Sequence, residues 1–88
     1  MSTITLLPGV YSVQDTSLPT GSYLFTPHRG EKLNLSVGEA PEGTEGERFS
    51  HYFIVRAGEK LHLDLREGWV LVLYDVAVVE KAAKVTLP

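Results

Sequence analysis

The sequence predicts an all-β domain: a small β-sandwich of jelly-roll-like form, or a compact barrel, with about seven to eight short strands. Three observations predict it. Apolar and polar residues alternate with a period of two, and a helical period is absent. Turn residues separate the alternating runs at intervals of about 8–12 residues. The 88 residues contain no cysteine and suffice for one domain, so we expect residues 1–88 to form a single β domain.

Two predicted strands alternate clearly, at residues 32–37 and 60–66, where leucines and a valine share one face and polar residues share the other. The less regular predicted strands lie at residues 2–7, 10–14, 22–26, 49–56 and 84–87. The turns between them are expected at residues 8–9, 18–21 and 67–68, which contain glycine or proline. Residues 80–84 are mildly helical in composition but too few to form a stable helix alone.

Residues 69–79 differ from the other strands because both of their faces are largely apolar. Such a strand must be covered on both sides. One side can be the core of the domain, and the other requires a second layer, supplied either by the same chain or by a neighbouring subunit. In the second case the predicted subunit interface consists of Trp69, Val70, Val72, Tyr74, Val76 and Val78.

An internal repeat relates two segments that are 28 residues apart, residues 22–37 and 50–65, with seven identical positions in sixteen. We expect each copy to be one strand–turn–strand unit of a pseudo-symmetric sandwich. Gly30 and Gly58 should adopt positive φ angles at the two turns, and Phe25 and Phe53 should be equivalent core residues. The alternative is that such turns converge by chance on the sequence Gly-Glu-Lys-Leu.

The net charge of −3 comes from residues 38–48, since the other residues are neutral in sum. This segment is rich in glycine and predicts a flexible acidic loop, either a plain connection or a loop that orders on the basic surface of a partner. The chain has no basic excess for nucleic acid and no apolar run of membrane-spanning length, so we expect neither partner.

Candidate chemistry is sparse. His62 and Asp64 lie two residues apart on one predicted strand, so they share a face and form half of a metal site that His51 could complete. Only His62-Leu63-Asp64 corresponds to the cupin pattern, whose second downstream histidine is missing, so a polar outer face in water is the favoured explanation of the pair. Ser50, His51 and Asp64 also provide the residue types of a catalytic triad, but nothing in the sequence places them together. We expect no cofactor and no enzymatic activity.

Tyr52 and Ile54 should point away from the core if Phe53 points inward. An exposed cluster of tyrosine, isoleucine and arginine is typical of a protein interface. The alternative is that a second layer of the same fold buries these side chains.

The N-terminal Ser2-Thr3-Ile4-Thr5-Leu6-Leu7-Pro8-Gly9 and the loop rich in Gly and Glu, within a short acidic all-β chain without cysteine, resemble the small virion proteins of tailed phages, above all capsid decoration (cement) proteins. The resemblance implies a structural protein on the capsid surface of the virion, which stabilises the lattice of the major capsid protein. Such proteins oligomerise, often as homotrimers. If the chain is not a virion protein, we expect it in the cytoplasm. It also implies capsid contacts through the N-terminal strand and the loop. Together with the two exposed residues of the predicted strand 49–56, the expected partner-binding residues are Ile4, Leu6, Glu42, Glu45, Glu47, Tyr52 and Ile54.

Two other functions remain open. The chain could be a carbohydrate- or peptide-binding β-sandwich module of a tail or fibre appendage, with an aromatic platform around Tyr52 or Trp69. It could also be a cupin-like metal-binding enzyme that uses His51, His62 and Asp64.

Overall fold

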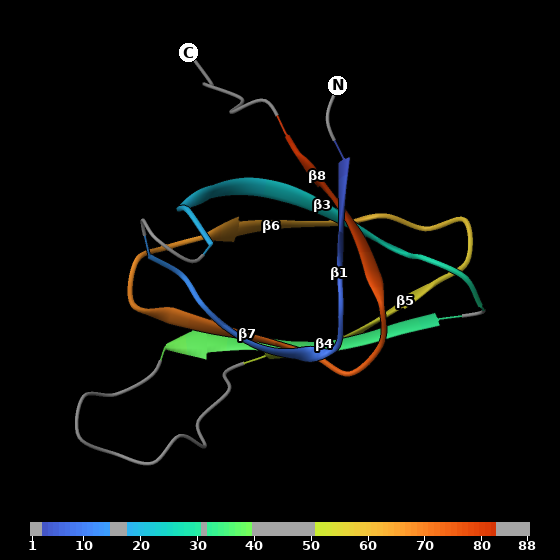
Figure 1. The fold of residues 1–88 in the computed structure, drawn as a ribbon, viewed down its shortest axis with the longest axis horizontal. Coiled ribbons are helices and arrows are strands. Elements are labelled where there is room, and N and C mark those ends of the chain that lie inside the picture. The colour runs from blue at the N-terminus through green and yellow to red at the C-terminus, as the bar shows by residue number, and fades with distance from the viewer. Residues whose placement is uncertain (1–2, 15–17, 31, 40–50, 83–88) are drawn as a thin grey trace.

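The computed structural model describes residues 3–14, 18–30, 32–39 and 51–82, which form eight β-strands (Figure 1). The predicted all-β class is confirmed. The strands are β1 (Thr3–Leu6), β2 (Gly9–Ser12), β3 (Gly21–Pro27), β4 (Lys32–Glu39), β5 (His51–Arg56), β6 (Leu61–Leu65), β7 (Trp69–Leu73) and β8 (Ala77–Lys81). Within the described residues, no helix is long and apolar enough to cross a membrane.

The strands form two antiparallel four-stranded sheets with the orders β1-β8-β3-β6 (sheet A) and β2-β7-β4-β5 (sheet B). Figure 1 shows β3 and β6 in one layer above β7 and β4 in the other. The chain changes sheets at every connection except the one from β4 to β5. This order is that of a jelly roll, so the sandwich rather than the barrel is the observed form.

The core lies between the two sheets and is filled by alternate residues of the strands. In sheet A, Phe25 is flanked across the ladders by Val79 and Leu61, and in sheet B, Leu35 is flanked by Leu73 and Phe53. The largest fully buried side chains are those of Val13, Phe25, Leu33, Leu35, Val37, Leu71, Leu73 and Val79. Burying one such side chain stabilises the folded state by about 1.5–3 kcal/mol. This burial determines which face of each strand points inward.

The two copies of the repeat are the units β3–β4 and β5–β6, and each crosses from one sheet to the other. β3 lies beside β6 in sheet A, and β4 lies beside β5 in sheet B, as expected for two related halves of a sandwich. Gly30 and Gly58 have φ angles of +123° and +87°, so the predicted positive φ at both turns is confirmed. Phe25 is fully buried, whereas Phe53 is half-buried against the core.

The prediction of one continuous strand over residues 69–79 was wrong. β7 ends at Leu73 in sheet B and β8 begins at Ala77 in sheet A, with a corner between them. At this corner the Asp75 carboxylate accepts hydrogen bonds from the main-chain N–H and the side-chain amide of Asn34, both at 2.8 Å. A polar anchor inside an apolar run therefore marks the point where the chain leaves one sheet for the other.

Two further boundaries differ from the sequence analysis. Gly38 and Glu39 end β4 instead of beginning the acidic loop, because Gly38 and Glu39 pair with β7. Glu80 and Lys81 belong to β8 and not to a helical turn, because their strand pairs with β1 and β3. The rest of the acidic loop, residues 40–48, and the predicted strand at residues 84–87 lie outside the described residues.

Candidate interaction surface

The outer face of sheet B carries four of the six exposed large apolar side chains among the described residues. Val10, Tyr52, Tyr74 and Ile54 are 70%, 58%, 52% and 45% exposed. Val70 and Val72 lie half-buried between them on the central strand β7. We call the set formed by Val10, Tyr52, Ile54, Val70, Val72 and Tyr74 the sheet B face.

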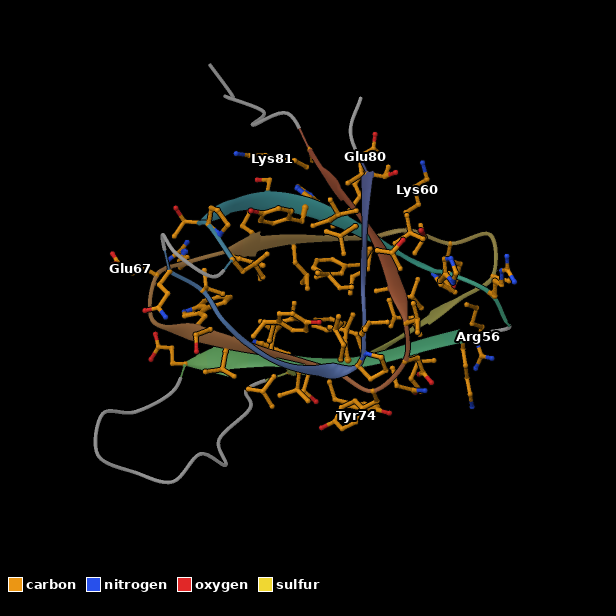
Figure 2. All side chains as sticks on the ribbon, viewed as in Figure 1. Arg56, Lys60, Glu67, Tyr74, Glu80 and Lys81 are labelled. Atoms are coloured by element: carbon orange, nitrogen blue, oxygen red, sulfur yellow. The ribbon has the colours of Figure 1, made fainter. Side chains whose placement is uncertain are left out.

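The strand register brings these side chains together. Val10 pairs with Val72, Val72 pairs with Ser36, and Ser36 pairs with Tyr52, so one row crosses all four strands. Alternation then directs these side chains away from the core, since their sequence neighbours Leu71, Leu35 and Phe53 point inward. Figure 2 shows Tyr74 below the lower layer, pointing away from the interior.

A hydrogen-bonded network holds the two tyrosines of this face. The Tyr52 hydroxyl donates to the Asn34 side-chain oxygen at 2.8 Å, and the Asn34 amide donates to Asp75 at 2.8 Å. The Ser36 hydroxyl donates to the Tyr74 hydroxyl at 3.4 Å, and the two tyrosine rings lie 6.1 Å apart with a tilt of 57°. Side chains that are already ordered lose less conformational entropy when a partner covers them.

The structure divides the predicted subunit-interface residues among four places. Val70, Val72 and Tyr74 belong to the sheet B face, and Val76 lies half-buried in the corner after β7. Val78 lies half-buried in β8 of sheet A, opposite Thr5 and Thr26. Trp69 packs against the core. The expected single apolar strip is therefore split, because the chain changes sheets within it.

The predicted partner-binding residues are divided as well. Tyr52 and Ile54 are exposed on the outer side of β5, in agreement with the prediction that they point away from Phe53. Ile4 is 50% exposed on the edge strand β1, whereas Leu6 packs against the core. Glu42, Glu45 and Glu47 lie outside the described residues.

Sequence reasoning missed four residues of this surface. Val10 could have been found from the alternation in residues 10–14, because Val10 and the inward-pointing Tyr11 lie on different faces of the strand. Asn34, Ser36 and Asp75 had no such signal, because their contacts depend on the register between strands that are distant in sequence.

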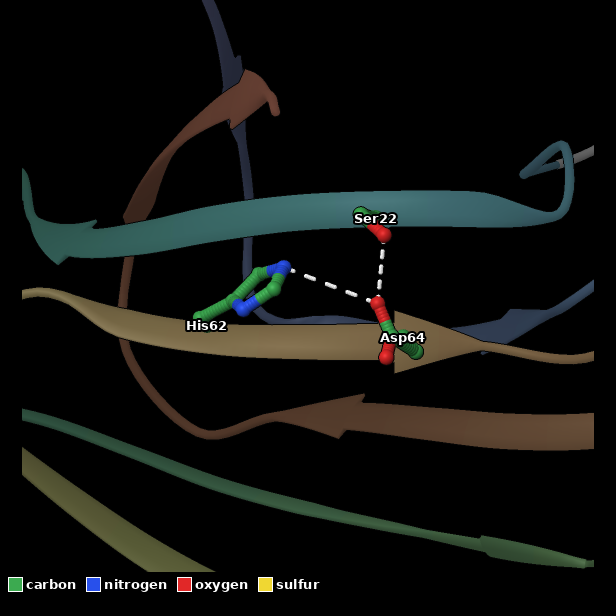
Figure 3. A network of polar contacts seen from close by, with 3 residues as sticks. All are labelled: Ser22, His62 and Asp64. Carbon is green, nitrogen blue, oxygen red and sulfur yellow. Dashed lines mark hydrogen bonds and ion pairs between the residues drawn. The ribbon is translucent and has the colours of Figure 1, made fainter. Parts of the chain in front are cut away.

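The polar cluster on sheet A consists of Ser22, His62 and Asp64 (Figure 3). The Ser22 hydroxyl donates a hydrogen bond to the Asp64 Oδ1 atom, and His62 Nε2 lies 3.5 Å from the same oxygen. The carboxylate thus stands between the hydroxyl and the imidazole, whereas a nucleophilic triad needs the imidazole beside the hydroxyl. Sequence reasoning found His62 and Asp64 on one face but gave no signal for Ser22.

The predicted third partner of His62 and Asp64 lies elsewhere. His51 is on β5 in sheet B, while His62 and Asp64 are on β6 in sheet A, because β5 and β6 are joined by a crossing between the sheets. Among the described residues, no group of three or more metal-ligating side chains is present. Ser50, the other predicted triad member, lies outside the described residues.

An open groove of about 710 Å³ runs beside the Ser22–His62–Asp64 cluster. Its charged lining includes Glu67, Arg66 and Lys81 in addition to Asp64. Charges of both signs share the groove, so its residues favour no single class of ligand.

The fold and the surface define a small jelly-roll sandwich with one apolar outer face. No family model matches the sequence, and no curated protein and no solved structure matches it.

Proposed function

We propose that this protein is a non-enzymatic assembly protein that docks through the sheet B face, and specifically that it is a tailed-phage capsid decoration protein. The observation that carries the proposal is the row of side chains across sheet B, which is apolar or aromatic on β2, β7 and β5 and is completed by Ser36 on β4. Exposed apolar patches of this kind mark interaction sites in proteins that otherwise keep such side chains inside. The assignment to phage capsids depends on the sequence resemblance.

The limited strength of one apolar contact favours a partner that binds many copies. Covering roughly 400 Å² of apolar surface contributes about 10 kcal/mol at about 25 cal/mol per Å². Association costs about 4–15 kcal/mol in lost translational and rotational freedom, so one such contact alone gives modest affinity. A capsid lattice presents the same partner surface repeatedly, and linked contacts then bind much more tightly than single ones.

Matched variants test the docking surface. Val72 and Val78 are both half-buried valines on central strands, on the outer faces of sheet B and sheet A respectively. We expect Val72→Glu to abolish co-sedimentation with shells assembled from the major capsid protein encoded in the same genome, because it places a charge in the contact. Val78→Glu should co-sediment like the parent protein, and both variants should keep the circular dichroism spectrum of the fold.

Two outcomes would overturn the proposal. The first is a parent protein that stays in the supernatant at every shell concentration. The second is a folded Val72→Glu variant that co-sediments as well as Val78→Glu does. A separate variant in which Glu42, Glu45 and Glu47 are changed to glutamine tests the predicted contribution of the acidic loop. These changes should weaken binding mainly at low salt, where charge interactions are least screened.

A second candidate function is carbohydrate binding. The tilted pair of Tyr52 and Tyr74 beside the Asn34 amide offers an aromatic surface next to polar groups. Binding to a glycan array that disappears in Tyr52→Ala but persists in Val10→Ala would favour this function over capsid docking.

A further inference from the structure

The strand β5 forms one edge of sheet B, and its main-chain groups can be oriented from the contacts of its neighbour Asn34. The N–H of Asn34 donates to Asp75 at 2.8 Å, and its carbonyl accepts from the N–H of Tyr74 at 3.0 Å. Both groups therefore point toward β7 and the corner after it, away from β5. Asn34 and its register partner Ile54 are thus a non-hydrogen-bonded pair, and the N–H and C=O of Ile54 point to the open side of β5.

Every second residue of a strand has the same orientation, so Tyr52 and Arg56 also direct their main-chain groups to this open side. The contacts of Arg56 agree, because its N–H donates to the Glu59 carboxylate and its carbonyl accepts from the Glu59 N–H, both at 2.9 Å. Glu59 therefore occupies the edge at Arg56. Within the described residues, no strand lies on this side of Tyr52 and Ile54.

The side chains at this edge are as open to a partner as the main chain. Tyr52 and Ile54 are about half exposed and belong to the sheet B face. The opposite arrangement occurs at β6, an edge of sheet A, where the outward side chains are His62 and Asp64. Charged side chains on an edge strand discourage pairing with another chain, and β5 lacks this protection at its two open positions.

We propose that β5 pairs in antiparallel fashion with β5 of a second copy of this chain, about a two-fold axis through Phe53. In this register Tyr52 lies opposite Ile54 of the partner subunit, and Ile54 lies opposite Tyr52 of the partner subunit. The four open main-chain groups of one copy then meet the four of the other in four hydrogen bonds. The same two pairs place an aromatic side chain against a branched aliphatic one, a favourable cross-strand combination.

Glu59 disfavours the register centred on Ile54. A shift that placed Ile54 opposite Ile54 of the partner subunit would require Tyr52 to pair with the main chain of Arg56 in the partner subunit. The corresponding groups of Arg56 are already bonded to Glu59. The register centred on Phe53 uses only groups that have no strand partner among residues 3–14, 18–30, 32–39 and 51–82.

The contact does not depend on the docking proposed above. A two-fold axis perpendicular to the sheet leaves both sheet B faces on the same side of a continuous eight-stranded sheet, so docking by that face would be reinforced. The contact is isologous and closes with two copies, so it predicts a dimer where the family resemblance predicts a trimer.

The test is sedimentation velocity from micromolar to millimolar protein, combined with amide hydrogen exchange of the same samples. We expect a monomer–dimer equilibrium in which the amides of Tyr52 and Ile54 become protected as concentration rises. Ile54→Pro removes an N–H that β4 does not use, and edge strands tolerate proline at such positions. It should raise the dimer dissociation constant at least tenfold, whereas Val72→Glu, away from the edge, should leave it unchanged.

Several results would overturn the inference: a monomer at every concentration, a trimer, or a dimer in which the amides of Tyr52 and Ile54 exchange rapidly. Protection that appears only when another protein is added would assign the edge to a strand of that protein instead. If Ile54→Pro does not fold, Ile54→Lys keeps the main chain intact and should weaken the dimer through the introduced charge, with His62→Lys on the β6 edge as its control. Because Val72→Glu tests docking and Ile54→Pro tests dimerisation, the failure of one proposal is distinguishable from the failure of the other.

Discussion

The outer faces of the two sheets differ although their inner faces are alike. Across sheet A the central outer row is Thr5, Val78 and Thr26, and across sheet B it is Val10, Val72, Ser36 and Tyr52. Sheet A therefore faces water with hydroxyl groups around one valine, whereas sheet B presents valines and an aromatic ring. Core packing restricts the inner faces to apolar residues. The outer faces have no such restriction, so apolar residues there indicate a binding partner.

The largest effect should come from the inner faces, where the two sheets are expected to be equivalent. Leu35→Ala in sheet B and Phe25→Ala in sheet A should each lower the free energy of unfolding by about 3–5 kcal/mol, because each leaves a cavity in the same core. Denaturant titration of both variants measures this. A loss below about 1 kcal/mol for only one of them would mean that the two sheets do not share one core.

A smaller difference in the free energy of unfolding is expected between variants of two aspartates, Asp75 after β7 of sheet B and Asp64 on β6 of sheet A. Asp75 is half-buried and accepts two hydrogen bonds from Asn34, so Asp75→Ala should lower the free energy of unfolding by about 2–3 kcal/mol. Asp64 is exposed on sheet A, and Asp64→Ala should change it by less than about 0.5 kcal/mol.

Thermal unfolding at neutral pH compares the two variants. Equal losses for Asp75→Ala and Asp64→Ala would show that the Asp75 corner does not anchor the crossing from sheet B to sheet A. Asn34→Ala should reproduce part of the Asp75→Ala loss, because it removes the donor side chain but keeps the main-chain N–H.

The smallest effect concerns the interior of sheet A. Burial raises the pKa of the Tyr23 hydroxyl above its ordinary value of about 10, and this hydroxyl donates to the Pro19 carbonyl at 2.6 Å. As pH rises, the unfolded chain loses this proton before the folded chain does, so stability is full below about pH 10 and falls as pH rises through the folded pKa.

Thermal midpoints measured from about pH 9 to about pH 11 should fall more steeply for the parent protein than for Tyr23→Phe, which lacks the titrating group. The variant should cost about 1 kcal/mol at neutral pH through the lost hydrogen bond. Identical slopes for the two proteins would mean that Tyr23 does not contribute to alkaline destabilisation.

The sequence predicted what depends on local pattern and missed what depends on register. Alternation and turn residues located six of the strands, β1 to β6, to within a few residues, and alternation correctly turned Tyr52 and Ile54 outward. The glycines of the repeat predicted both turns. Residues 69–79 were assigned to one strand because valines continue through the corner, and only the contact with Asn34, about 40 residues away, shows where the chain turns.

The candidate surface was predictable in part for the same reason. Alternation identifies which residues of one strand point outward, so Val70, Val72, Tyr52 and Ile54 were within reach. It does not say which strands become neighbours, and so the grouping of Val10 with Val72, and of Ser22 with Asp64, could not be foreseen. The assignment to phage capsids remains a prediction.

The pairing of β1 with β8 has a consequence for how the protein is made. Thr3 lies opposite Glu80, so β1 can pair only after the residues up to β8 have been synthesised. Of the six ladders, only that of β4 and β5 joins consecutive strands. Such non-local topologies fold in about milliseconds to seconds, slower than local ones. The apolar strands of a nascent chain therefore stay unpaired, and open to contact with other chains, until β8 has been synthesised.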